Sequence, residues 1–142
     1  MLMGAYWGGV CIATSSTTAV HALAYPLGGK YRMAHGLSNA ILLPSVMAFN
    51  QQGNEKRFAA MATAMGLPVT GLSDAAAADA FVQALRQLNT DLNIPNSLQG
   101  FGIATSDIDG LVEGASKVTR LLDNNPRPMG RDDMRAIYTA LL

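Results

Sequence analysis

Apolar residues recur at helical spacing between Ser73 and Leu92. These positions are Ala77, Phe81, Ala84, Leu85, Leu88 and Leu92, which repeat with a period of about 3.6 residues. Ser73 is of the type that caps a helix N-terminus, and Asp74 places a negative charge in the first turn, where the helix dipole favours it. Because Asn93-Ile94-Pro95 does not continue the pattern, we expect one helix to fill this segment.

Similar apolar stripes predict three more helices in the second part of the chain. They lie near residues 55–65, 106–122 and 131–142. In the second of them, Ser106 is followed three residues later by Asp109, which resembles a capping box. Since no strand pattern of convincing length occurs, the sequence predicts a single all-α domain, a multi-helix bundle that spans the whole chain.

The N-terminal part of the chain also favours helices, but two prolines interrupt them. We expect a helix from Ser16 to Tyr25, a turn over Pro26–Gly29 that ends it, and another helix over Leu37–Asn50. Pro44 lies inside this last helix. Proline lacks a backbone N–H and clashes with the carbonyl group four residues earlier, so we expect a kink or break near Ala40.

Charge is distributed unevenly along the 142 residues. Lys+Arg and Asp+Glu number 10 each, so the formal net charge is zero, and only Lys30 and Arg32 precede Glu55. This balance argues against a protein that binds nucleic acid through an excess of cations. The single cysteine, Cys11, excludes an internal disulfide and a cysteine-based zinc site, and we expect it to be buried as a small hydrophobe.

The segment Met1–Gly29 contains no charged residue, yet it is not typical of a membrane or export segment. A signal peptide has a positive region before its apolar run, and a membrane-spanning helix needs about 20 apolar residues. Met1–Ala13 is shorter than that, and the hydroxyl-bearing run Thr14–Thr18 interrupts it. We therefore expect this segment to pack inside protein, and we expect no membrane partner.

His21 and His35 are the two histidines of the chain. If the turn at Pro26–Gly29 folds the chain back, both imidazoles can face one point, and imidazole is a common ligand of zinc and iron. A pair of histidines without a short motif is more often structural, so their spacing alone leaves both roles open.

The residues around the histidines form an ordered motif. It consists of His21, Pro26, Leu27, Gly28, His35, Gly36, Asn39, Ala40, Pro44 and Asn50, and Asn125-Pro126-Arg127 follows near the C-terminus. In this order and spacing the motif resembles the metal-binding segment of the iron-containing (group III) alcohol dehydrogenases. The resemblance covers essentially the whole chain and is strongest from Ser16 to Asn50. It implies the all-helical C-terminal domain of that family.

The resemblance also implies a metal site. His21 and His35 match two of the family's four metal ligands, which hold Fe²⁺ or sometimes Zn²⁺. The metal acts as a Lewis acid on the oxygen of a small alcohol or aldehyde, while hydride moves to or from NAD or NADP. The other two ligands, an Asp and a His four residues apart, have no counterpart here, and neither does the Gly-Gly-Gly-Ser segment of the dinucleotide-binding domain.

We therefore expect residues 1–142 to be the helical metal-ligand domain without its N-terminal dinucleotide-binding domain. A catalytic metal normally has three protein ligands and one open position. Since this chain offers two, we expect the chain alone to bind metal weakly or not at all, and to be inactive.

Two further residues of the motif have candidate roles. Tyr25 stands where many members carry another histidine, close to substrate and nicotinamide. A phenol there can donate a hydrogen bond but does not titrate near neutral pH; the alternative is a half-buried residue at a helix end. Asn39 lies one turn after His35 and can orient its imidazole; the alternative is a cap for the backbone that Pro44 leaves unpaired.

Three hypotheses follow from the sequence. The first is a cytoplasmic part of an iron-dependent alcohol dehydrogenase, whose partner is the dinucleotide-binding domain and whose substrate is a small alcohol or aldehyde. The second is a non-catalytic helical module that self-associates through its apolar face. The third is a membrane-associated helical protein. The first also explains the missing charges, because a charge buried at a cleft between domains costs several kcal/mol.

Overall fold

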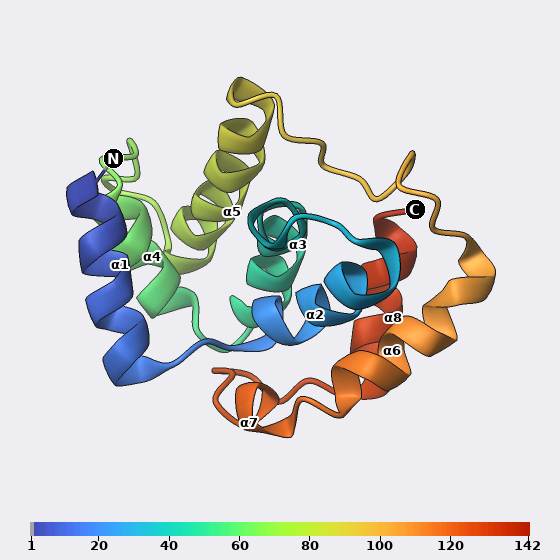
Figure 1. Ribbon diagram of the computed structural model, residues 1–142. Coiled ribbons are helices and arrows are strands. Elements are labelled where there is room, and N and C mark those ends of the chain that lie inside the picture. The colour runs from blue at the N-terminus through green and yellow to red at the C-terminus, as the bar shows by residue number, and fades with distance from the viewer. Residues whose placement is uncertain (1) are drawn as a thin grey trace.

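The computed structural model describes residues 2–142, and all its regular elements are helices (Figure 1). In chain order they are α1 (Leu2–Ser15), α2 (Ala19–Tyr31), α3 (His35–Asn50), α4 (Glu55–Ala64), α5 (Asp74–Asp91), the 3₁₀ helix η1 (Thr105–Asp107), α6 (Ile108–Ser116), α7 (Thr119–Leu122) and α8 (Arg131–Ala140). The described part of the chain contains no strand. The predicted all-α class is therefore confirmed.

The main core lies where α2 packs against α3 and α6, and α6 packs against α8. Its largest fully buried side chains include Leu23, Leu27, Leu111, Met134 and Tyr138. The sequence explains this arrangement, because the apolar stripes of α6 and α8 recur at helical spacing, and α6 packs against both α2 and α8. Helix α2 is thereby fixed on two sides.

A second, smaller core lies between α4 and α5. Phe58 and Phe81 pack edge to face, with ring centroids 5.5 Å apart and an interplanar angle of 88°. The helix predicted after Ser73 is confirmed, since the Ser73 hydroxyl accepts a hydrogen bond from the Ala76 N–H and caps α5. Side chains of α3, among them Leu43 and Met47, join this cluster to the main core.

The expected turn at Pro26–Gly29 is wrong, because α2 continues through it to Tyr31. Proline leaves one carbonyl of the preceding turn without its N–H partner. The neighbouring Leu23 carbonyl accepts a hydrogen bond of 2.7 Å from the buried Tyr138 hydroxyl. The ring of Pro26 is held against α6, where a Cβ atom added to Gly114 would lie 3.0 Å from Pro26 Cγ. Tertiary packing therefore keeps the helix intact, and the chain reverses only after it.

Helix α3 likewise runs without a break from His35 to Asn50, so of the kink or break expected near Ala40 the break does not occur. The carbonyl oxygen of Ala40, whose usual partner is missing at Pro44, accepts a hydrogen bond of 2.8 Å from Asn89 Nδ2. Asn89 comes from the facing helix α5 and is itself buried. A side chain 49 residues away thus satisfies the backbone that the proline disturbs.

The capping box expected at Ser106 is also wrong. The chain forms η1 first, and the Asp107 carboxylate accepts a hydrogen bond from the Ala104 N–H. Helix α6 then starts at Ile108 and ends at Ser116, so the single helix expected over residues 106–122 is divided into α6 and α7.

Helix α1 has no buried residue and extends along the edge of the molecule (Figure 1). Its large side chains are exposed, with Leu2, Met3 and Trp7 at 88%, 68% and 58%. Cys11 is exposed as well, which corrects the expectation that it is buried. The expectation that the uncharged N-terminal segment packs inside protein is therefore wrong for α1, whereas the residues of this segment that belong to α2 lie in the main core. No helix of residues 2–142 has the length and apolar character needed to cross a membrane.

Candidate metal centre

The two histidines lie in the N-terminal turns of α2 and α3. His21 is in the first turn of α2, and His35 is the first residue of α3. Between the helices, Arg32 adopts a left-handed conformation with φ of 55°, and its N–H bonds to carbonyls of the last turn of α2. This reversal brings the imidazole rings together, with centroids 5.2 Å apart and an interplanar angle of 58°.

The environment of His21 favours its neutral form. His21 is half-buried, and its burial, together with the neighbouring His35, lowers the pKa of its imidazole below 6.5. Neutral imidazole is the form that binds a metal. The side chain also borders a pocket of about 360 Å³ whose wall includes Ile12, Thr18 and Asn39.

Asn39 contacts the other histidine. Its Nδ2 donates a hydrogen bond of 2.7 Å to the His35 carbonyl oxygen and lies 3.4 and 3.3 Å from the two ring nitrogens. Because these two distances are nearly equal, the amide is not aimed at either nitrogen, and the bond to the carbonyl is the directional one. Asn39 does not cap the backbone freed by Pro44, since Asn89 does so. Asn39 therefore fixes the position of His35 at the start of α3.

Tyr25 lies one turn after His21 on α2. Its side chain is 45% exposed, and its ring centroid is 6.2 Å from that of His35. The structure thus brings Tyr25, His21, His35 and Asn39 to one surface at the junction of α2 and α3. Tyr25 is about half exposed, but it does not lie at a helix end, because α2 continues to Tyr31.

The remaining asparagines of the motif hold this junction in place. Asn50 and Asn125 pair side chain to side chain, with Nδ2 to Oδ1 distances of 3.0 and 2.7 Å. Asn125 also accepts from the Ala19 N–H at 3.4 Å and donates to the Arg127 carbonyl at 2.6 Å. Both asparagines are buried. Since Ala19 begins α2, this network fixes the N-terminal end of the helix that carries His21.

Neighbouring residues extend the same network. The Arg127 guanidinium donates to the Phe49 carbonyl and lies 3.9 Å from the centroid of the Phe49 ring. Asn124 Nδ2 donates to the carbonyls of Ser15 and Thr17, between α1 and α2. The motif Asn125-Pro126-Arg127 therefore organises the junction from a distance of more than 70 residues in sequence. The sequence motif included Asn125, but the sequence gave no indication that its side chain pairs with that of Asn50.

Comparison with known proteins identifies the family. The family model for the C-terminal part of the Fe-containing alcohol dehydrogenases matches residues 1–142. The chain belongs to the iron-containing alcohol dehydrogenase family. The resemblance in the sequence motif is thereby confirmed, together with the assignment to the C-terminal part of these enzymes.

Individual relatives of the family agree. The chain is 41% identical to long-chain-alcohol dehydrogenase 1 of Geobacillus thermodenitrificans, over 99% of this chain and 35% of that protein. It is 36% identical to 1,3-propanediol dehydrogenase of Klebsiella pneumoniae, over 92% of this chain and 33% of that protein. The crystal structure of a 1,3-propanediol oxidoreductase also matches, with a TM-score of 0.85 and 36% sequence identity. The matched region covers 89% of this chain and 33% of the crystallised chain. The chain thus spans about a third of the length of these relatives.

The residues present fit one side of a metal site. Two imidazoles face each other, and one of them is held in its neutral form. Within residues 2–142 there is no cluster of three or more His, Cys, Asp or Glu side chains that could enclose a metal ion. The donor set is therefore right in type for zinc or iron, and a complete site requires further ligands.

Proposed function

We propose that this chain is the metal-ligand part of an iron-dependent NAD(P) alcohol dehydrogenase, in which His21 and His35 bind the metal. The observation that carries the proposal is the approach of the two imidazoles to within 5.2 Å, at the end of an intact α2, in a chain of this family. When bound, Fe²⁺ or Zn²⁺ polarises the oxygen of a small alcohol or aldehyde for hydride exchange with NAD or NADP.

The other residues of the junction have supporting roles in this proposal. Asn39 holds the backbone of His35, so that the imidazole keeps its direction. Tyr25 stands beside His35 with its phenol exposed, where it can donate a hydrogen bond to a substrate oxygen. In this proposal Tyr25 positions the substrate.

The exposure of helix α1 supports the proposal that another part of the protein covers it. A helix with apolar side chains all around and no buried residue is normally covered by other protein. We propose that the part that precedes this region in the relatives, including a dinucleotide-binding domain, covers α1 and supplies the remaining metal ligands. The same exposed surface favours a second candidate, a non-catalytic module that self-associates through α1.

A fusion protein distinguishes the two candidates. The N-terminal two thirds of the Geobacillus relative are joined to this chain, and NAD(P)-dependent oxidation of alcohols is measured after loading with iron or zinc. We expect activity that the His35→Ala variant lacks, and no activity or retained metal in the 142-residue chain alone. An inactive, monomeric and folded fusion would contradict the proposal, and a stable oligomer of the chain alone would favour the module.

A further inference from the structure

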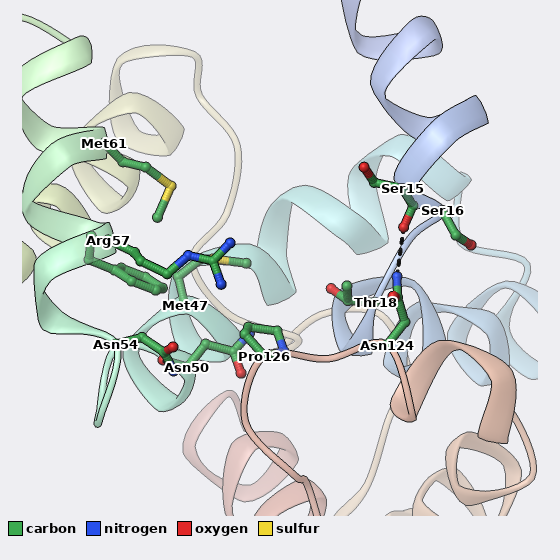
Figure 2. Close-up of a pocket in the computed structure, with 11 residues that line it drawn as sticks. Ser15, Ser16, Thr18, Met47, Asn50, Asn54, Arg57, Met61, Asn124 and Pro126 are labelled. Carbon is green, nitrogen blue, oxygen red and sulfur yellow. Dashed lines mark hydrogen bonds between the residues drawn. The ribbon is translucent and has the colours of Figure 1, made fainter.

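Besides the pocket next to His21, a second pocket borders the segment between α1 and α2. It has a volume of about 510 Å³ and is bounded by this segment, the C-terminal end of α3, helix α4 and the loop after α7. Figure 2 shows Arg57 and Met61 reaching from α4 towards the opposite wall, where Thr18 and Asn124 lie. A pocket of this size can hold a small organic ligand.

Among the described residues 2–142, Arg57 is the one charged residue that lines this pocket. Its guanidinium makes no hydrogen bond and no ion pair with any residue in the range 2–142 that the structure describes. The nearest acidic residue in sequence, Glu55, is engaged elsewhere, because its carboxylate accepts a hydrogen bond from the Gly53 N–H. A guanidinium offers five N–H donors in a planar fork that matches a carboxylate or a phosphate.

A second guanidinium is bonded to a residue of the pocket wall, although it does not line the pocket itself. Arg120 on α7 donates a hydrogen bond of 3.0 Å to the hydroxyl of Ser16, which lines the pocket. The ion pairs of the described chain are Lys30–Asp107, Lys117–Glu113 and Arg135–Asp109, so neither Arg57 nor Arg120 has a carboxylate partner. One cation lines the pocket, a second is bonded to its wall, and no carboxylate of residues 2–142 lines it, so these charges favour an anion there.

The rest of the wall is partly apolar. Met47, Phe58 and Met61 present carbon and sulfur atoms next to Arg57. We propose that this pocket binds a small organic anion, whose carboxylate or phosphate group pairs with Arg57 and whose apolar body lies over the methionines. The hydroxyl group of Thr18 lies in the same wall and can donate a further hydrogen bond to the anion, whereas the Asn124 amide already donates to the carbonyls of Ser15 and Thr17.

This site is separate from the histidine pair. Neither His21 nor His35 lines it, although the smaller pocket beside His21 shares Ser16, Thr18 and Met47 with it. The anion site therefore does not rest on the metal-binding proposal, and each can fail without the other.

Heteronuclear NMR of the 142-residue chain tests the proposal with three ligands that share one alkyl chain. Hexanoate and hexyl phosphate carry the two candidate anions, and hexanamide is the neutral control. We expect saturable shifts of the backbone amides of Thr18, Asn54 and Asn124 with at least one of the two anions, and binding about tenfold weaker with hexanamide. The stronger of the two anions identifies the head group.

Two charge variants decide whether Arg57 is responsible. Arg57→Gln and Lys56→Gln each remove one cation from exposed positions of α4, but only Arg57 lines the pocket. We expect about tenfold weaker anion binding in Arg57→Gln, unchanged binding in Lys56→Gln and partial retention in Arg57→Lys. Equal weakening in both glutamine variants, or hexanamide binding as tightly as the anions, would overturn the proposal.

Discussion

The Asn50–Asn125 pair offers a sharp test of what holds the candidate metal centre together. Asn125→Ala removes two hydrogen bonds to Asn50, one to the Arg127 carbonyl and a longer one to the Ala19 N–H. At about 1 kcal/mol for each net hydrogen bond, we expect a loss of about 3 to 4 kcal/mol in the free energy of unfolding. Asn50→Ala removes only the reciprocal pair, and we expect a loss of about 2 to 3 kcal/mol.

The double variant separates pairing from burial. If the two amides stabilise the fold by bonding to each other, the combined loss is about 4 kcal/mol, and a coupling energy of about 2 kcal/mol remains. Urea unfolding followed by far-ultraviolet circular dichroism measures all four corners of this cycle. Additive losses in the double variant would refute the reasoning, because each asparagine would then act through other partners.

Two further predictions concern packing and pH. Gly114→Ala should lower the free energy of unfolding by about 1 to 3 kcal/mol, because its Cβ would meet the Pro26 ring at 3.0 Å. Gly110→Ala on the same helix meets nothing within 4 Å and should raise stability by up to about 1 kcal/mol; thermal unfolding that gives the two variants the same sign would contradict this. The hydrogen bond from Lys30, with that from the Ala104 N–H, lowers the pKa of Asp107 to about 2, against 3.8 for an ordinary aspartate. The ionised Asp107 carboxylate therefore stabilises the folded state at neutral pH. This stabilisation is lost as the pH falls from about 4 to about 2, because the unfolded state takes up the proton first. A carboxyl titration by NMR that gives an ordinary value would refute this.

Local sequence signals predicted the helices well where packing agrees with them. The Ser73 cap and the apolar stripe behind it are confirmed in α5, since both depend on residues within a few turns. The same reasoning failed at Pro26, where the helix was expected to end, and the break that was one of two expectations at Pro44 does not occur. There the disturbed backbone lies in the core: Asn89 bonds the Ala40 carbonyl that Pro44 leaves free, and Tyr138 bonds the Leu23 carbonyl next to the one that Pro26 leaves free. A sequence read locally cannot reveal such partners.

The candidate site, too, could be predicted from the sequence only in part. The motif identified the residues that meet at the α2–α3 junction, including His21 and His35. It did not reveal that Asn50 and Asn125 pair, because these residues are 75 positions apart and neither is unusual alone. Nor did it foresee the exposure of α1, which depends on what covers an apolar helix and not on its own sequence.

Metal stoichiometry in the fusion protein tests the central claim most directly. Iron or zinc is determined after dialysis in the fusion and in its His21→Ala, His35→Ala and Tyr25→Phe variants, each checked for folding by circular dichroism. We predict close to one metal ion per chain in the parent and in Tyr25→Phe, and loss of most of it in either histidine variant. Folded histidine variants that retain the metal as firmly as the parent would contradict the assignment of His21 and His35 as ligands.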